Sequence, residues 1–497
     1  MKEIKLVQIL RTFSKEEIKE FEKFVASPYF SRGRDLNPFY KLLKFYHPDF
    51  NNPNFTKEKI FRKLYPDEKY NKSTAENVLR VLSSELTKLA EEFLSAELAK
   101  SNRFRNRINL LDALIDKNLD KLFAKLFSDS LKNIDKLTGE FYGMQFVDLY
   151  YFYMLDLKNN FSNNRVDKGH IECNIYLLIF FFQCASNLID NSRKRNNNHN
   201  IITGDDTVEQ FMKNFDFKSF ISYLNSKNGI KKKDKDLLEM CLYNFMLTLD
   251  KDNVNLAAKT EKLFYKHRRL FNDDTKFNFY AVIHNVYSGR NDKVKLNILY
   301  NKILEDDICS AEKGAQFSFV LYRLILQNFT DLNKLADAES FITKYTPHLN
   351  SDKKESFYNF GFALIEFKRN NFDKALEYIS KVEMLFILFK YDIRNLYLMI
   401  YYELDYSDEA YSLLDSYKHF LKNNKSVSDE RRGTNDRFAG WYRKLLSAKL
   451  SGNRSDLSTI KKQITEDKKI VHKEWLLEKF EELNKLKIKS YELRVTS

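Results

Sequence analysis

Turn-forming residues are scarce in this chain, which holds only 12 glycines and 6 prolines among 497 residues. All-β folds and turn-rich α/β folds need many such residues, because tight turns require left-handed or proline-fixed backbone conformations. Apolar residues fall mostly three or four positions apart and seldom alternate, which is the spacing of an amphipathic helix. The sequence therefore predicts an all-α fold.

The first part of the chain predicts an N-terminal helical module, residues 1–100. Ser14 and Glu17 have the spacing of a capping box. In this motif the serine hydroxyl accepts a hydrogen bond from the backbone N–H of the glutamate, and the glutamate side chain accepts one from the backbone N–H of the serine. Ser73 and Glu76 repeat this spacing before the strongest helical pattern of the sequence, which continues to the end of the module. Neither alternating strands nor a glycine-rich turn follows. The module is therefore predicted to be helix-turn-helix-like but wingless, that is, without the two strands that flank the groove in winged-helix DNA readers.

Nucleic-acid binding by this module is an alternative that the sequence leaves open. A short basic helix in TKEKIFRKLYP (56–66) precedes a helix whose exposed face includes Arg80 and Lys88, and many winged-helix DNA readers begin in this way. The chain has a formal net charge of +14, but residues 1–100 hold 19 basic and 15 acidic side chains. The positive charge is spread along the chain, as is expected when an AT-rich genome favours lysine codons throughout, rather than concentrated on one face of the module. We therefore rank nucleic-acid contact through Arg80 and Lys88 below protein binding.

The rest of the chain predicts a tetratricopeptide-like α-solenoid, which is a series of stacked helix pairs. We divide it into a first helical array (101–190), a polar Asn-rich loop (191–206), preferred over a basic nucleic-acid arm, and helical repeats with a C-terminal helix (207–497). The clearest repeat is FYNFGFALIEFKRNNFDKALEYISKV (357–382), with less regular copies at spacings of roughly 35–45 residues. Its predicted packing residues are Ala363, Phe372, Ala375 and Val382. The register before residue 357 and the residues that face the groove stay open.

Five segments occur in an order that resembles a known family. They are FEKFVASPYFSRGRDL (21–36), FTKEKIFRKLYP (55–66), ENVLRVLSSELTKLAEEFL (76–94), FDKALEYISKVE (372–383) and KEWLLEKFEEL (473–483). Over nearly its full length the chain resembles a family of uncharacterised tetratricopeptide-like helical-repeat proteins of Bacteroidota-type bacteria, most specifically at SPYF (27–30). The repeat departs from the tetratricopeptide pattern at Glu366, where that pattern prefers tyrosine. The resemblance implies this fold but no activity, so it assigns no functional residue.

No catalytic, cofactor-binding or metal-binding motif is found in the sequence. The glycines form no phosphate-binding loop, and neither the HExxH metal motif nor the GxSxG nucleophile elbow occurs. The four cysteines have no zinc-site or redox spacing and are expected to be buried in a reducing cytosol; they are Cys173, Cys184, Cys241 and Cys309. We therefore expect a protein that is not an enzyme and holds no cofactor.

The leading functional hypothesis is a cytoplasmic protein–protein interaction scaffold. The most apolar run, IYLLIFFFQCA (175–185), is shorter than the ~20 residues that cross a bilayer, so we expect a buried helix and no membrane partner. Stacked helix pairs form a long concave surface without any catalytic geometry. The expected partner is another protein or a peptide in the repeat groove, and its identity, the pathway and the oligomeric state stay open.

Overall fold

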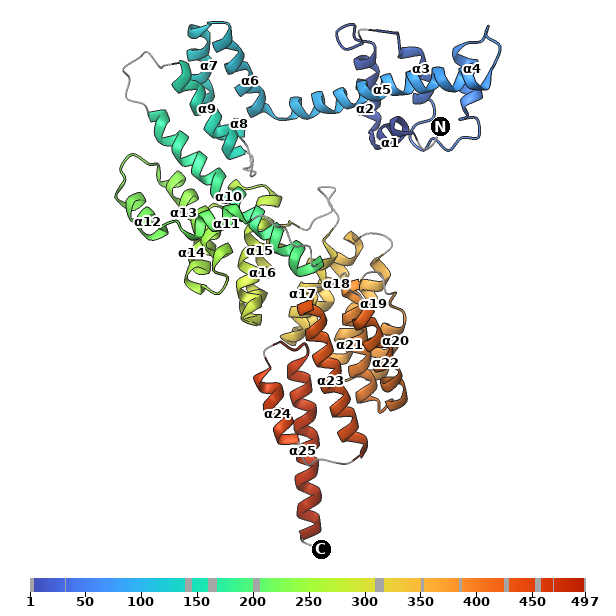
Figure 1. The fold of residues 1–497 in the computed structure, drawn as a ribbon, viewed down its shortest axis with the longest axis vertical. Helices are drawn as coiled ribbons and strands as arrows, with labels where there is room; N and C mark the ends of the chain where they lie inside the picture. The colour runs from blue at the N-terminus through green and yellow to red at the C-terminus, as the bar shows by residue number, and fades with distance from the viewer. Residues whose placement is uncertain are drawn as a thin grey trace. The chain divides into compact units, whose positions relative to one another are not determined.

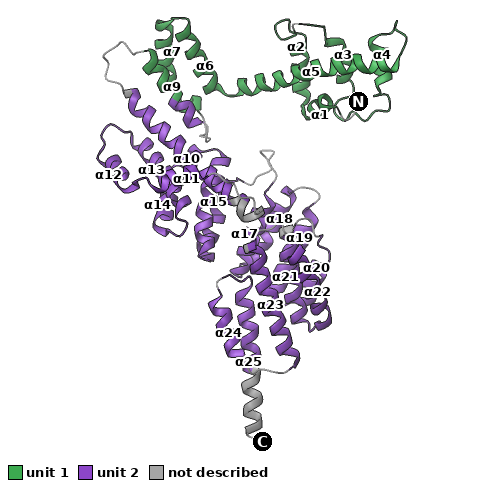
Figure 2. Cartoon of the chain, in the orientation of Figure 1, with its two compact units in different colours: residues 1–139, 151–165 green, residues 140–150, 166–497 purple. Residues whose placement is uncertain are grey.

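The chain is described by a computed structural model for residues 4–31, 33–138, 145–159, 168–199, 206–308, 317–349, 353–383, 387–423, 429–451, 457–467 and 469–495. In these ranges every regular element is a helix, with 25 α-helices, short 3-10 turns and no strand (Figure 1). The all-α prediction is therefore confirmed. The chain divides into two compact units, residues 1–139 with 151–165, and residues 140–150 with 166–497 (Figure 2).

The first unit begins with short helices that pack on one long helix. In chain order its helices are α1 (Lys5–Thr12), α2 (Lys15–Val25), α3 (Asn37–Lys44), α4 (Lys57–Leu64), α5 (Lys72–Ser101), α6 (Arg103–Asp116), α7 (Asp120–Lys132), α8 (Ile134–Thr138) and, shared with the second unit, α9 (Gln145–Asn159). The helices α1, α2 and α4 each contact α5, and α3 contacts α2 and α4. The long helix therefore supplies the surface on which the shorter ones assemble.

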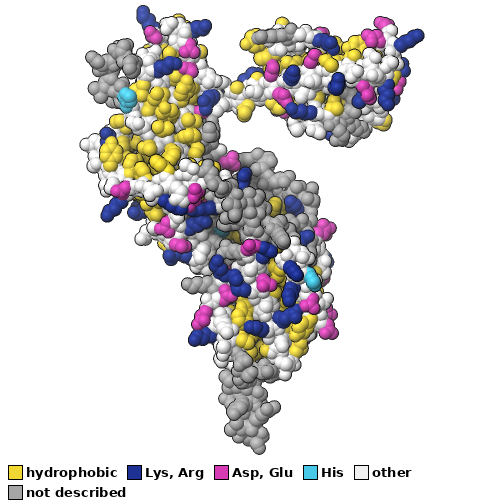
Figure 3. All heavy atoms as spheres, in the orientation of Figure 1, with side chains coloured by type: hydrophobic (Ala, Val, Ile, Leu, Met, Phe, Trp, Pro, Cys, Tyr) yellow, Lys and Arg dark blue, Asp and Glu magenta, His cyan; other side chains and the backbone are white. Residues whose placement is uncertain are grey.

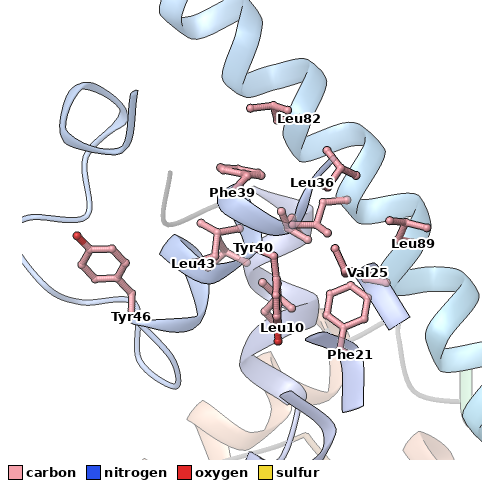
Figure 4. Packing of buried hydrophobic residues seen from close by; sticks show 14 of the residues in the cluster. Leu10, Phe21, Val25, Leu36, Phe39, Tyr40, Leu43, Tyr46, Leu82 and Leu89 are labelled. Atoms are coloured by element: carbon pink, nitrogen blue, oxygen red, sulfur yellow. The ribbon is translucent and has the colours of Figure 1, made fainter. Parts of the chain in front are cut away.

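Aromatic rings fill the centre of this N-terminal core (Figure 4). The Phe21 ring lies 5.0 Å from the Tyr40 ring in an edge arrangement and 5.2 Å from the Phe93 ring, at separations that favour aromatic pairs. The buried Tyr40 hydroxyl donates a hydrogen bond to the Ile18 carbonyl at 2.6 Å, so its polar atom is satisfied inside the core. These contacts join α2, α3 and α5 in one interior.

The predicted N-terminal cap of α2 is confirmed. The Ser14 hydroxyl accepts a hydrogen bond from the Glu17 N–H at 3.1 Å, and the Glu17 carboxylate accepts one from the Ser14 N–H at 2.7 Å. Two N–H groups that a helix end leaves without partners are thereby satisfied. The capping box thus fixes where α2 begins.

The predicted capping box of α5 is wrong. The Asn71 side chain caps this helix, because its Oδ1 accepts hydrogen bonds from the N–H groups of Ser73 and Thr74 at 3.0 and 3.2 Å. Asparagine is as good a cap as serine, so the pattern alone did not separate the two. Glu76 instead forms an ion pair with Lys57 of α4 at 3.1 Å.

The second unit is a succession of helices that pack in chain order. They are α10 (Lys168–His199), α11 (Thr207–Lys213), α12 (Phe217–Ser226), α13 (Lys232–Leu249), α14 (Val254–His267), α15 (Asp273–Gly289), α16 (Lys293–Glu305), α17 (Phe319–Asp331), α18 (Leu335–Tyr345), α19 (Lys354–Lys368), α20 (Phe372–Ser380), α21 (Ile387–Glu403), α22 (Ser407–Asn423), α23 (Asp429–Ser451), α24 (Leu457–Glu466) and α25 (Lys473–Val495). From α13 to α23 each helix contacts the next one, and alternate helices also meet, α13 with α15, α17 with α19, and α19 with α21.

The structure differs from the predicted Asn-rich loop at 191–206. The helix α10 continues to His199, and the segment 200–205 lies outside the described residues. No glycine or proline lies between 191 and 199, and asparagine costs a helix interior less than about 1 kcal/mol. A polar composition without a strong helix breaker therefore did not end the helix.

One turn recurs between the helices of a pair. Two positions after the first helix ends, one residue has a left-handed φ of 54° to 62°, and the second helix begins two positions later. In the second unit this residue is Asn291, Asn333, Asn370 or Asp405, in steps of 42, 37 and 35 residues, and in the first unit it is Asn118. In every copy the next N–H donates to the carbonyl five residues before it at 2.9 Å. This hydrogen bond is that of a Schellman motif, with asparagine or aspartate in the place that glycine usually takes.

The turn between α19 and α20 is also held by a buried carboxylate. The two oxygens of Glu366 accept hydrogen bonds from Arg369 Nη1 at 2.9 Å and from Asn371 Nδ2 at 2.8 Å. Burial raises the pKa of Glu366, but these hydrogen bonds outweigh it, so its pKa lies below the ordinary value of 4.5. The glutamate that departs from the tetratricopeptide pattern therefore stabilises the turn.

We expect Asn333→Ala to lower the free energy of unfolding by about 1–2 kcal/mol, because alanine is strained in a left-handed conformation. Asn333→Gly should change it by less than about 1 kcal/mol, since glycine adopts this conformation freely. Urea denaturation measures both. Asn301→Ala, at an exposed helical position of α16, is the control and should not destabilise the protein. Equal losses in both alanine variants would contradict the role of the turn.

We expect Glu366→Gln to lower the free energy of unfolding at pH 7 by about 1–3 kcal/mol, because it removes a charged acceptor from two hydrogen bonds. The folded-state pKa of Glu366 is lowered, so its stabilisation is complete above pH 4.5 and is lost as the pH falls through that lowered pKa. The difference between wild type and variant should therefore shrink below pH 4.5 in denaturation measured across pH. Glu377→Gln, at an exposed ion pair with Lys381, should change little at any pH.

Candidate functional site

A row of exposed apolar side chains lies on α10. Leu177, Phe181, Cys184 and Leu188 follow one another in steps of four, three and four residues, which places them on one face of the helix along about 16 Å. Leu177 exposes 43% of its surface, Phe181 36% and Leu188 59%, and Cys184 is partly buried. We call these four residues the α10 stripe.

The opposite face of α10 lies in the interior of the second unit. Ile175, Ile179 and Phe182 are buried, and the Phe182 ring lies 5.9 Å from the ring of Phe245 on α13. The sequence predicts a buried helix for 175–185, whereas the structure buries only the face that α13 covers. The α10 stripe is the apolar surface left over after this packing.

The same helix is the one candidate membrane span in the described part of the chain. The 25 residues from Gly169 to Arg193 contain an 18-residue window with a mean hydropathy of 1.3, so this segment is long and apolar enough to cross a bilayer by length and composition alone. A core helix of a soluble protein passes the same test, and 44% of the apolar window is buried inside the protein. Its main contact is with α13, and α11 also packs against it.

Two neighbouring helices add exposed aromatic side chains to this part of the unit. Phe211 of α11 exposes 63% of its surface and Tyr223 of α12 exposes 52%. Hydrophobic side chains gather over the α10–α13 part of the second unit (Figure 3). Single exposed apolar residues are normal on a soluble protein, but a gathering of them marks an interaction surface.

The two residues of the nucleic-acid alternative lie on the long helix of the first unit. Arg80 and Lys88 are both exposed on α5, which continues as one helix of 30 residues to Ser101. No strand follows it among the described residues of this unit. Acidic side chains share the same helix, since Glu76 pairs with Lys57 and Glu91 pairs with Lys5.

The predicted packing residues of the repeat lie where α19 meets α20. Ala363 and Ala375 are completely buried. Phe372 is the first residue of α20, and its ring lies 5.5 Å from that of Phe367. Val382 follows the end of α20 and is half-buried.

Sequence reasoning missed a closer helix contact in the same repeat. A Cβ atom on Gly361 would lie 2.6 Å from Ile342 Cδ1 and 3.3 Å from Leu326 Cδ2, so this glycine lets α19 approach α17 and α18. Glycine is rare in this chain, so a glycine inside a predicted helix was the signal from which this close contact could have been predicted.

Metal and thiol chemistry have little support among the described residues. No group of three His, Cys, Asp or Glu side chains there is arranged to hold a metal ion. Cys173, Cys184 and Cys241 form no disulfide within the described part of the chain, and burial raises the pKa of Cys241 to about 12, which makes that thiol a poor nucleophile. Cys309 lies outside the described residues.

Comparisons with known proteins give no match, since no family model, no curated protein and no solved structure is similar to this chain at a significant level. The resemblance of the five sequence segments to a helical-repeat family therefore stays a prediction. The candidate site is argued from the geometry and chemistry of this chain alone.

Proposed function

We propose that this chain is a non-catalytic helical-repeat scaffold that binds a helix of another protein. The α10 stripe is the observation that carries this proposal. Apolar side chains in steps of four and three residues form the seam by which two helices pack side by side. An amphipathic helix of a partner protein presents the complementary row, so its apolar face and the stripe would be removed from water together.

The energy available at the stripe fits a specific but reversible complex. Complete burial of one leucine or phenylalanine side chain contributes about 1.5–3 kcal/mol, and three of them are exposed to a large extent on α10. Association costs at least about 4 kcal/mol in lost translational and rotational freedom. The stripe can therefore serve as the central contact of an interface, while the polar residues around it set the specificity for the partner.

The regular turns support the solenoid part of the proposal. Left-handed residues in steps of 42, 37 and 35 join pairs of antiparallel helices, and successive helices contact one another from α13 to α23. This organisation is the one expected of a tetratricopeptide-like array, in which each pair rests on its neighbours. Such an array holds a binding surface rigidly without any catalytic group, and we place the scaffold in the cytoplasm.

We expect a triple-serine variant of the stripe to lose partner binding while it keeps its fold. The experiment begins with the full-length chain purified from its native host through a small affinity tag, and the co-purified protein is then produced by itself. Loss of three buried apolar contacts should raise the dissociation constant at least about 100-fold, since each such contact is worth more than about 1 kcal/mol. The variant carries Leu177→Ser, Phe181→Ser and Leu188→Ser, and calorimetry measures its affinity.

A matched control removes three exposed leucines from the first unit. Their exposed fractions are 74%, 48% and 50%, so the control changes a similar apolar area outside the stripe; it carries Leu98→Ser, Leu110→Ser and Leu122→Ser. Its affinity for the partner should equal that of the wild type. A wild-type chain recovered alone at native abundance, or equal binding by both triple variants, would refute the proposal.

A nucleic-acid-associated regulator is the second candidate function, favoured by the exposure of Arg80 and Lys88 on one helix. If both side chains contact phosphate, Arg80→Ala with Lys88→Ala should flatten the slope of log K against log salt by about 2. Under the scaffold proposal we expect an unchanged slope or no duplex binding at low salt. Lys117→Ala with Lys125→Ala, two exposed lysines at the same spacing in the same unit, is the control for charge alone.

A further inference from the structure

The row of side chains on α10 extends beyond its four apolar residues. Asn174 lies three positions before Leu177, Asn191 lies three positions after Leu188, and both asparagines are exposed. From 174 to 191 the row therefore advances in steps of three, four, three, four and three residues along one continuous helix. This alternation is the heptad spacing by which one side of a helix faces a second helix in a coiled coil. We call the α10 stripe together with Asn174 and Asn191 the α10 seam.

The α10 seam reads almost the same in both directions. Its spacing is symmetric about the point midway between its two central residues, and an asparagine followed by a leucine stands at either end. A two-fold axis through this point, perpendicular to the helix, sets each residue opposite its counterpart on a second copy. Leu177 then lies opposite Leu188, and Asn174 lies opposite Asn191. An isologous dimer requires a surface that is complementary to itself in this way.

The two central residues favour an antiparallel pair of helices over a parallel one. In the antiparallel pair Phe181 of one copy lies opposite Cys184 of the other, and this contact occurs twice. A parallel pair would set phenylalanine against phenylalanine in one layer and thiol against thiol in the next. A large side chain opposite a small one fills both layers evenly, as close packing demands. Antiparallel helices also bring the opposite ends of their dipoles together.

The asparagines at the two ends fix the register of this pairing. A side-chain amide carries both donors and acceptors, so Asn174 and Asn191 of two copies can hydrogen-bond to each other when they lie opposite. A slip by one heptad would set Asn191 against Phe181 and leave the amide without a partner in an apolar contact, which is costly. A single polar residue in an apolar seam specifies the register of a coiled coil in the same way.

We propose that, without its partner helix, the chain forms an antiparallel dimer through the α10 seams of two copies. The seam extends over about 26 Å of helix, and the half-buried Leu178 and Phe180 border it. Every pair in the seam occurs twice in the dimer, so both copies remove their exposed apolar side chains from water. The inference rests on the proposed function for the choice of surface. A second copy and a partner helix cover the same residues and therefore exclude each other.

Sedimentation equilibrium of the purified full-length chain, free of any partner, tests the dimer. The average mass should approach twice the monomer mass of 59.3 kDa as the concentration rises. The triple-serine variant of the α10 stripe should associate at least about 100-fold more weakly, because each lost contact occurs twice. The matched control with three serines in the first unit should dimerise as the wild type does. A wild type that stays at the monomer mass up to about 0.5 mM, or equal dimerisation of the two triple variants, overturns the proposal.

Two complementary charge variants test the antiparallel direction. Leu177→Lys and Leu188→Glu should each dimerise about 10-fold more weakly or worse when alone, because a charge then faces leucine in both outer pairs. In a mixture of the two variants, one outer pair joins lysine with glutamate and the other keeps two leucines, so the mixture should dimerise at a concentration where each variant alone is a monomer. This recovery also shows that both variants are folded. A mixture that associates no more than its components overturns the antiparallel arrangement.

A mixture of Leu177→Lys with Leu177→Glu is the control for direction. These two positions face each other only in a parallel pair, so this mixture should not recover the dimer, and recovery here instead would overturn the proposal. The proposed function and the dimer fail separately. A wild type recovered from its host without another protein, yet as a dimer, refutes the partner and supports the seam, whereas a monomer that binds a co-purified protein through the stripe does the reverse.

Discussion

The left-handed turn between paired helices is the constraint on which the second unit depends. An antiparallel pair needs a reversal within three residues, and a short reversal of this kind requires one residue with positive φ. The chain supplies asparagine or aspartate at this position, from Asn291 to Asp405, and the hydrogen bond across each turn has the same length of 2.9 Å. Identical turns set each pair in a similar arrangement, so successive pairs can stack on one another. A chain with 12 glycines thereby forms regular reversals without using glycine for them.

The fold class could be predicted because it depends on a property of the whole sequence, whereas the ends of its helices depend on single side chains. A chain with few glycines and prolines, and with apolar residues at helical spacing, is expected to form helices and little other regular structure. The capping box at Ser14 has no competing cap nearby, so its prediction was also unambiguous. At α5 two capping residues, Asn71 and Ser73, compete within three positions, and only the structure shows which one accepts the N–H groups. The turn residue Asn370 looked like an ordinary polar loop residue, because asparagine is abundant throughout the chain.

The exposed face of α10 could not be predicted, because exposure is decided by what packs against a helix. The sequence from 175 to 185 is apolar on all sides, and periodicity does not reveal which side a neighbour covers. Once Ile175, Ile179 and Phe182 are buried, with Phe182 packed against Phe245 of α13, the residues of the α10 stripe form a row facing water. Exposed apolar area of this kind lowers the solubility of a protein that leaves it uncovered. The proposed binding role would explain its presence, whereas a purely structural role for α10 needs only the buried face.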